Sequence, residues 1–420
     1  MPRRLLTGSL LGAIDQAVLS AFSLGVGLAF IRLGSKYEYA AYTLLFSALQ
    51  LAQAVQNALI SSPLTTLGAG RSASGGVNSL TEAAKRLQSW LVAAIVGACV
   101  LGALWDWFVG AARVPVIAAL ALASAGLLSR EFIRAGHFLR HQALRALASD
   151  LFYVGVAAAL IGALILAHAL TAALVLGAMG VAGLTSAFRS GLGSRRLFGA
   201  VPAAERAHMI ELWACAKWAL PSVVNSWLQA NAFLFLVQWL ISHEAVADLS
   251  ASRLLLVPLS FLAVGWASAF RPRATSLFAN GQVAQVHRMA MRSAIGFLAV
   301  GAIYGGCLYL AMPLLQSAVL GPKYTGLGWM VVSWLVLFIV MAVRGVGMTC
   351  MLTHPSGFRS LYVYGCVALI VAVPAVVMAG LAGSLPCVVA GLSLSELVLA
   401  GLIWGHGWPA LRRIGARPMA

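Results

Sequence analysis

The stretch Thr325–Leu352 reads TGLGWMVVSWLVLFIVMAVRGVGMTCML and carries one charged residue, Arg344. A helix needs about 20 apolar residues to cross the hydrocarbon core of a bilayer, and this stretch exceeds that length. In the whole 420-residue chain, 61% of the residues are hydrophobic and 9% are charged, whereas roughly a quarter of a soluble domain is charged. The sequence therefore predicts an all-α polytopic membrane protein.

Outward from this stretch, apolar runs of spanning length recur on both sides and predict about twelve transmembrane helices. The fifth and sixth runs are separated only by a tight turn at His168. The expected spans are Ser9–Ile31, Ala40–Ser62, Gln88–Gly110, Val114–Ser129, Ala148–Ala167, Leu170–Phe188, Trp213–Ile241, Val246–Phe270, Ala290–Met312, Thr325–Leu352, Ser360–Leu381 and Leu385–Gly407.

The basic residues support this count, because they lie in short segments that alternate between the two sides of the membrane. With a cytoplasmic N-terminus, most of the 28 Lys and Arg residues, including Arg130–Arg145, fall on the cytoplasmic side, as the positive-inside rule requires. We therefore expect a multi-pass protein of the bacterial inner (cytoplasmic) membrane with both termini cytoplasmic. Topology accounts for the net charge of +17, so nucleic acid is not an expected partner.

The longest cytoplasmic link, Arg189–Lys217, divides the chain into two sets of six spans. We expect an N-lobe over residues 1–200 and a C-lobe over residues 201–420. The second span of each set ends alike, in LISSPLTTLGAGRS around Pro63 and in AFRPRATSLFANGQ around Pro272. Such weak internal symmetry is typical of a duplicated six-helix unit.

Three segments carry a resemblance to a known family. They are QNALISSPLTTLG (Gln56–Gly68), SREFIRAGHFLRHQALRALASD (Ser129–Asp150) and ASRLLLVPLSFLAVGWASAFRPRA (Ala251–Ala274). In this order the sequence resembles the polysaccharide and lipid-linked oligosaccharide flippases of the multidrug/oligosaccharidyl-lipid/polysaccharide exporter superfamily. Ser129–Asp150 resembles the family's basic link between helices four and five. The resemblance implies two pseudo-symmetric six-helix lobes around a central cleft that opens to one side at a time.

The resemblance also implies a function. The substrate would be a polyprenyl diphosphate that carries an oligosaccharide repeat unit and is flipped from the inner to the outer leaflet for polysaccharide export. The implied partners are this lipid-linked substrate, the membrane lipids and the polysaccharide polymerase machinery. A flippase of this kind is not an enzyme.

Two predicted spans carry polar side chains at helical spacing, beginning at Ser47 and at Ser222. Amides and hydroxyls suit sugars, because they both donate and accept hydrogen bonds. The alternative is that these groups join helix to helix, as polar residues commonly do in membranes. The candidate cleft-lining residues are Gln50, Gln53, Asn57, Asn225 and Gln229.

Among the charged residues inside predicted spans, four are candidates for function, because a full charge at the centre of a membrane helix costs about 2.5–3.5 kcal/mol on insertion scales. Arg344 and Arg253 are candidates for binding an anionic headgroup, because a guanidinium offers a bidentate fork to phosphate oxygens. Lys217, near the membrane interface, is a third candidate. The alternative for Arg344 is that it only neutralises the buried carboxylate of Glu396 or Asp15.

Asp15 and Glu396 are the candidates for coupling transport to a proton or a sodium ion. A carboxyl group in a cavity of low dielectric constant can load and release a proton near neutral pH, whereas one paired with an arginine stays ionised. Asp15 has no obvious partner close to it in the sequence. No catalytic set, metal site or ATP-binding phosphate loop is apparent, so no cofactor is expected.

Three alternative functions stay open. A multidrug exporter of the same superfamily would also carry an acidic residue in its first helix, but its cavity should be acidic, whereas two arginines balance two carboxylates here. A peptidoglycan-precursor flippase should carry more cations in its cleft. A membrane polysaccharide polymerase or ligase usually has a long outer loop with charged catalytic residues, and the outer links of this chain are short.

Overall fold

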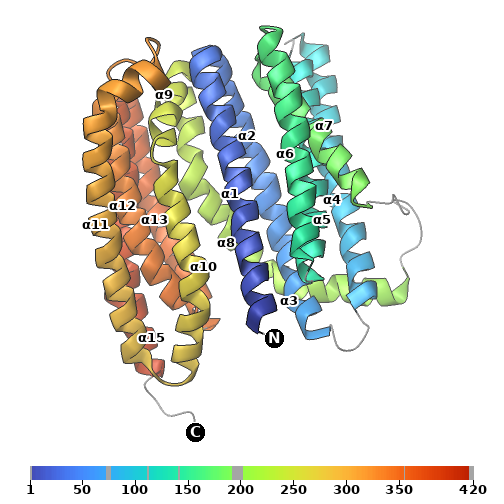
Figure 1. Cartoon of the computed structure of the whole chain (residues 1–420), viewed down its shortest axis with the longest axis vertical. Coiled ribbons are helices and arrows are strands. Elements are labelled where there is room, and N and C mark those ends of the chain that lie inside the picture. Colours follow the sequence, from blue (N-terminus) through green and yellow to red (C-terminus); the bar gives the residue numbers. More distant parts are fainter. Residues whose placement is uncertain are drawn as a thin grey trace. The chain divides into compact units, whose positions relative to one another are not determined.

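The computed structural model describes residues 2–71, 77–110, 113–140, 142–191, 202–353 and 355–415. Within these ranges the regular secondary structure is entirely helical (Figure 1). The chain divides into two compact units, unit 1 (Met1–Val224) and unit 2 (Asn225–Ala420). The division falls within helix α8 (Ala203–Leu240), whereas the sequence placed the lobe boundary after residue 200.

Unit 1 consists mainly of long helices. One interruption, the π-helical turn η1, directly precedes Pro63, which has no N–H to continue the helical hydrogen bonds. The span nevertheless continues through it, from Lys36 to Leu67. The elements are α1 (Pro2–Leu33), α2 (Lys36–Gln56), η1 (Asn57–Ser61), α3 (Ser62–Arg71), α4 (Val77–Val109), α5 (Val114–Leu139), α6 (Ala143–Leu166), α7 (Ala172–Arg189) and the N-terminal part of α8.

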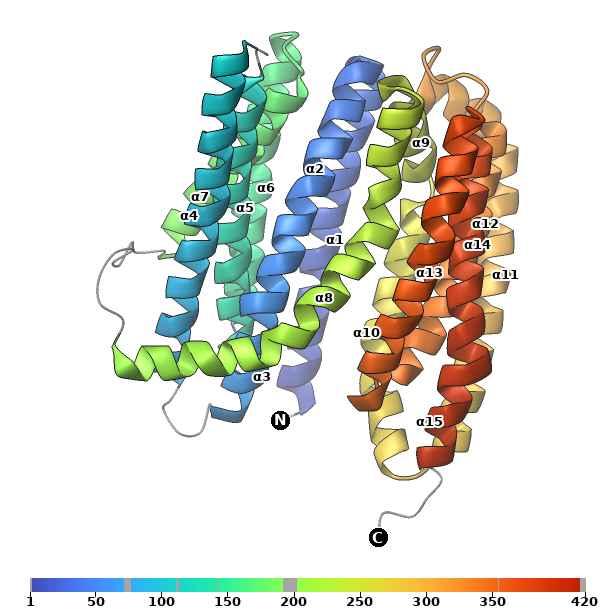
Figure 2. The ribbon, with the colours of Figure 1, turned by 180° about the vertical axis from the view of Figure 1, so that it is seen from behind.

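Unit 2 is also built from helices with short connections, as Figure 2 shows from behind. Its elements are the C-terminal part of α8, α9 (His243–Leu254), α10 (Val257–Ala279), α11 (Val283–Leu315), η2 (Gln316–Leu320), α12 (Gly328–Met351), α13 (Pro355–Leu381), α14 (Leu385–Leu402), η3 (Ile403–Gly407) and α15 (Trp408–Gly415).

The number of membrane spans agrees with the sequence. In the part of the chain that the structure describes, eleven helical segments are long and apolar enough to cross a membrane. Helices α9 and α10 make a twelfth if the bent pair counts as one span. Six spans then lie before Lys217 and six after it. The predicted fold class, a polytopic all-α protein with about twelve spans, is confirmed.

The eighth span, expected over Val246–Phe270, is bent by 52° between α9 and α10. Leu255 and Leu256 separate α9 from α10, and Pro258 stands in the first turn of α10. Proline is tolerated in the first turn of a helix but not in its interior. Arg253 consequently lies in the last turn of α9, directly before the break.

The spans expected to end at Ser129 and to begin at Ala148 are shorter than the helices found there. Helix α5 continues to Leu139 and α6 begins at Ala143, so most of the segment Ser129–Asp150 is helical. Arg130, expected in a cytoplasmic link, is buried within α5. It pairs there with Glu131 of the same helix and Asp150 of α6.

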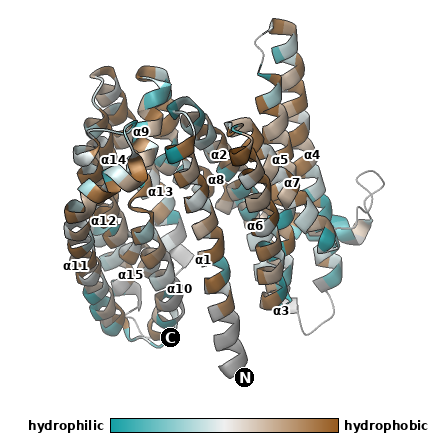
Figure 3. Cartoon of the chain, turned by 45° about the horizontal axis from the view of Figure 1, so that its top comes forward, coloured by the Kyte–Doolittle hydropathy of each residue, from teal (hydrophilic) through white to brown (hydrophobic). Residues whose placement is uncertain are grey.

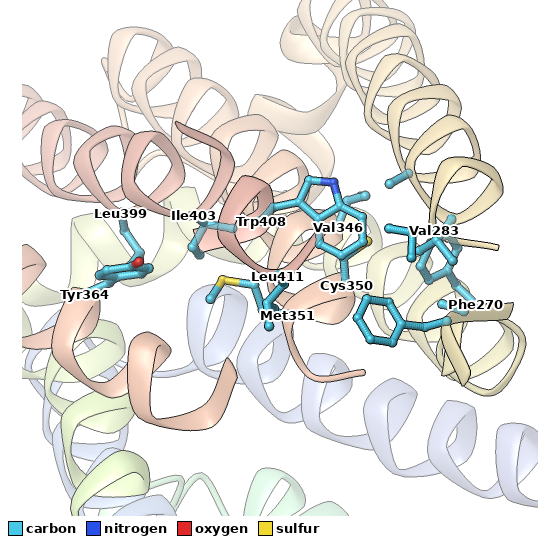
Figure 4. Close-up of a cluster of buried hydrophobic side chains, with 14 of the residues drawn as sticks. Phe270, Val283, Val346, Cys350, Met351, Tyr364, Leu399, Ile403, Trp408 and Leu411 are labelled. Atoms are coloured by element: carbon cyan, nitrogen blue, oxygen red, sulfur yellow. The ribbon is translucent and has the colours of Figure 1, made fainter. Parts of the chain in front are cut away.

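Each unit has an apolar core. In unit 1 the core joins α3, α4, the end of α5 and Leu212 of α8. In unit 2 a larger cluster joins α10, α11 and α12 to the C-terminal helices, with Phe270, Met351 and Trp408 among its members (Figure 4). The sequence thus builds a core within each unit.

The outward faces of the helices are apolar as well. Large side chains such as Trp105, Phe108, Leu310 and Ile370 are more than two-thirds exposed, and apolar residues run along most helices (Figure 3). Exposed apolar surface on this scale is unsuited to water. These faces fit the hydrocarbon core of a membrane.

Helices α5 and α7 approach each other closely enough for their backbones to touch. A Cβ atom on Gly180 would lie 2.6 Å from the carbonyl oxygen of Leu122, and one on Gly183 would lie 2.6 Å from the carbonyl carbon of Gly126. Small residues permit this kind of packing between membrane helices. The glycines therefore set the spacing of the two helices.

We expect Gly180→Val to destabilise unit 1, because a side chain forced into a packed contact costs about 1–3 kcal/mol. The thermal unfolding midpoint of the purified protein in detergent measures the loss. Gly177→Val, on the same helix, is the matched control, because a Cβ atom at Gly177 meets nothing within 4 Å. Equal losses in both variants would contradict the close α5–α7 contact.

Candidate functional site

Unit 2 contains a pocket of about 210 Å³ that combines charged, polar and aromatic side chains from α8, α9, α12 and α14. Four of its residues were proposed from the sequence: both buried arginines, one amide and one carboxylate. The pocket is lined by Ser226, Gln229, Ala230, Phe233, Arg253, Trp334, Leu337, Phe338, Met341, Arg344, Met348, Leu392, Ser395 and Glu396.

Arg344 and Glu396 form an ion pair within this pocket. The Nε atom of Arg344 on α12 lies 2.5 Å from Oε2 of Glu396 on α14, and the two side chains are 18% and 12% exposed. Pairing offsets the cost of holding either charge away from water. Glu396 is thus the carboxylate that neutralises Arg344. Both groups still face the pocket, so the pairing is compatible with a binding role for Arg344.

Arg253 is held against an aromatic wall of the same pocket. Its guanidinium carbon lies 5.6 Å from the ring centroid of Trp334, within the range of a cation–π interaction. The indole of Trp334 donates a hydrogen bond of 3.1 Å to the Ser252 hydroxyl, and its ring packs against Phe233 and Phe338. This packing fixes a second cation at the pocket.

The two predicted amides of α8, Asn225 and Gln229, lie against Gly365 of α13. The Nε2 atom of Gln229 donates to the carbonyl oxygen of Gly365 at 3.0 Å. Gly365 also leaves room for Asn225, since a Cβ atom there would collide with both amides. Asn225 is buried. Gln229 thus both joins helices and lines the pocket, and the role of Asn225 in lining a cleft stays a prediction.

Unit 1 holds a second group of buried charges, on α1, α5 and α6. The Nη2 atom of Arg134 lies 2.8 Å from Oδ2 of Asp15, and its Nε lies 3.0 Å from Oδ2 of Asp150. Both aspartates have no exposed surface. Asp15 thus has a direct partner, and that partner comes from a helix far along the chain, since none was apparent close to it in the sequence.

A second arginine completes this group. Nη1 of Arg130 lies 3.6 Å from Oδ1 of Asp150, and its guanidinium carbon lies 4.1 Å from the ring centroid of Tyr153. Glu131 approaches both arginines, with its carboxylate 3.1 Å from Nη1 of Arg134 and 3.6 Å from Nη2 of Arg130. Three carboxylates and two guanidiniums therefore pair with one another at the junction of three helices, with one carboxylate in excess.

The amides predicted on the second span lie on one face of α2 and η1. Gln50 and Asn57 are exposed in unit 1 and Gln53 is half-buried. Gln56, by contrast, is buried and donates hydrogen bonds to Gln88 Oε1 at 2.9 Å and to the Leu128 carbonyl at 2.7 Å. The exposed face retains free polar surface, and its role in lining a cleft stays a prediction.

Lys217 is exposed on α8 within unit 1. It is not among the residues that line the pocket of unit 2. Its proposed contact with an anionic headgroup therefore gains no support from that pocket and stays a prediction.

Sequence reasoning missed Arg134, Asp150 and the aromatic wall around Trp334. Arg134 was assigned to a basic link, because charges near the end of an apolar run usually report topology. One signal was available: Arg130 and Arg134 are four residues apart, so they share one face of a helix. Trp334 offered no such signal, since tryptophan is common in apolar spans.

Within the described residues, no group of three His, Cys, Asp or Glu side chains is placed to hold a metal ion. The positive charges in the pocket of unit 2 and in the buried charge group of unit 1 are supplied by arginine side chains. What the pocket of unit 2 offers chemically is binding of an anion by guanidinium groups beside an amide and apolar rings.

Comparison with known proteins gives matches in structure but not in sequence. No family model matches the sequence, and no curated protein matches it.

The lipid II flippase MurJ in an inward closed conformation is similar with a TM-score of 0.69 at 11% identity, over 98% of this chain and 90% of that one. A eukaryotic MATE transporter is similar with a TM-score of 0.61 at 14% identity, over 98% and 99% of the two chains. A MOP-superfamily transporter from Pyrococcus furiosus, described as having a binding pocket of reverse polarity, has a TM-score of 0.66 at 15% identity, over 99% and 96%. MOP is the multidrug/oligosaccharidyl-lipid/polysaccharide exporter superfamily that the sequence resembles. This chain has the two-lobed fold of its transporters.

Proposed function

We propose that this chain is a transporter that flips a polyprenyl-diphosphate-linked oligosaccharide from the inner to the outer leaflet, by alternating access, for polysaccharide export. The observation that carries the proposal is the pocket of unit 2, where Arg253, Arg344 and Gln229 face a common space. Guanidinium groups bind phosphate oxygens through paired hydrogen bonds, and amides suit sugars.

The size of the pocket fits part of such a substrate. A volume of about 210 Å³ is small beside the 300–1,000 Å³ typical of pockets for whole drug-sized ligands. In this proposal the pocket takes the diphosphate and the first sugar. The polyprenyl chain stays in the bilayer, where its hydrocarbon needs no protein shelter.

Three parts of this proposal, which concern the protein's place in the cell and its energy source, rest on the sequence resemblance. They are the inner-membrane location with cytoplasmic termini, coupling to a proton or sodium ion through Asp15 or Glu396, and work beside polysaccharide polymerase machinery. One of the similar structures is a lipid II flippase, which is consistent with a lipid-linked substrate.

The second candidate function is a multidrug exporter. The buried charges of unit 1 favour it, because Asp15, Glu131 and Asp150 carry one more charge than Arg130 and Arg134 neutralise. An excess of negative charge suits a cationic drug. However, Asp15 and Asp150 have no exposed surface, so neither offers a drug a carboxylate in this conformation.

A reconstitution experiment separates the two functions. The purified chain is placed in liposomes with a polyprenyl diphosphate that carries a fluorescent oligosaccharide, and an impermeant quencher reports the fraction in each leaflet. We expect rapid redistribution of the labelled lipid and no movement of an organic cation dye in parallel liposomes. Dye transport without lipid flipping would replace the proposed function with the second candidate.

A further inference from the structure

The Arg344–Glu396 pair occupies part of the pocket that the proposed function assigns to a diphosphate. Nε of Arg344 contacts Oε2 of Glu396 at 2.5 Å. On another side of the guanidinium, Nη1 lies 3.7 Å from the sulfur of Met348. One nitrogen of the guanidinium fork is therefore in an ion pair with a carboxylate.

A carboxylate and a phosphate present the same chemistry to an arginine. Both are anionic groups whose oxygens accept parallel N–H hydrogen bonds from the guanidinium fork. Glu396 lines the pocket together with Arg253 and Gln229, so its oxygen stands where an incoming phosphate oxygen would meet Arg344. The two anions cannot hold the same donor at once.

We propose that Glu396 is a resident competitor for the anionic headgroup: it holds Arg344 while the pocket is empty, and a phosphate oxygen of the substrate displaces it. This inference rests on the proposed function of the pocket. Glu396 is then a positioning and affinity-setting residue that acts through Arg344.

The exchange has a physical rationale for transport. Without Glu396, an empty pocket would leave the Arg344 charge uncompensated inside a membrane span, which is costly. With Glu396, binding replaces one anion by another, so the gain on binding is smaller than for a free guanidinium. Transport requires binding that is strong enough to load and weak enough to release. A displaceable carboxylate meets both requirements.

The test measures binding of inorganic pyrophosphate and of farnesyl diphosphate to the full chain in lipid nanodiscs. We expect both probes to bind Glu396→Gln about tenfold more tightly than the unmodified protein. Arg344→Ala in the Glu396→Gln background should lose this binding. Glu244→Gln is the matched control, because Glu244 is an exposed carboxylate at the start of α9 in the same unit and should leave both affinities unchanged.

A second variant keeps the test decisive if Glu396→Gln does not fold. Glu396→Asp retains the charge but withdraws the carboxylate by one methylene from Arg344, and we expect it to raise the affinity about threefold. Equal affinity in all Glu396 variants, with binding still dependent on Arg344, would overturn the competition while leaving the proposed function intact. Absence of binding to every variant, including the unmodified chain, would overturn both.

Discussion

Arg344→Ala is expected to abolish flipping of the lipid-linked substrate while the protein still accumulates in the membrane. Arg344 lines the pocket together with Arg253. In the proposed complex its loss leaves a substrate phosphate without its cationic partner, which typically costs about 2–5 kcal/mol. That range corresponds to a loss of affinity of about 30-fold or more. Arg344→Lys should recover part of the activity, because it restores the charge but not the planar fork. The liposome assay with the labelled lipid measures each variant.

The controls separate binding from charge balance. Arg292→Ala removes an exposed arginine of α11 in the same unit and should leave flipping unchanged. The double variant Arg344→Gln with Glu396→Gln removes both charges of the pair and should stay inactive, because the pocket then lacks a cation that the substrate needs. Full activity of this double variant would show that Arg344 serves only to neutralise Glu396.

The sequence predictions of pocket residues that agree with the structure all used one argument, the free-energy cost of placing a charged side chain in an apolar membrane span. Arg344 and Glu396 stood out because a full charge within an apolar run is rare and expensive, and the structure pairs them. The same argument selected Arg253, which lies at the wall of the pocket. Each of these choices needed only the hydropathy of the residues around it.

The sequence reading failed where the outcome depends on helices that are distant in the chain. Arg134 looked like a cytoplasmic charge, and only the meeting of α1, α5 and α6 shows that it neutralises Asp15 and Asp150. The bend after Arg253 had a local signal in Pro258, but a proline is compatible both with a kinked span and with two separate helices. Contacts that depend on the packing of several helices cannot be predicted from the residue pattern of one helix.

Arg134→Met is expected to destabilise unit 1 by about 3–5 kcal/mol, the typical cost of breaking a buried pair by removing one partner. The variant leaves Asp15 and Asp150 fully buried, with Arg130 as the remaining cation at 3.6 Å from Asp150. In a unit of this size the loss should lower the thermal unfolding midpoint by roughly 6–20 °C. Thermal unfolding of the purified protein in detergent measures it.

Three companion variants identify the cause of the loss. Asp15→Asn should cost less, because Arg134 keeps its contacts with Asp150 and Glu131, and this variant should remain folded for tests of ion coupling. Combining Asp15→Asn with Arg134→Met removes one charge of each sign and should restore part of the stability. Arg145→Met, at an exposed arginine of α6, is the matched control and should leave the midpoint unchanged. If Arg134→Met proves as stable as this control, the charge group of unit 1 does not hold the three helices together, and Asp15 becomes available as an independent site for a coupling ion.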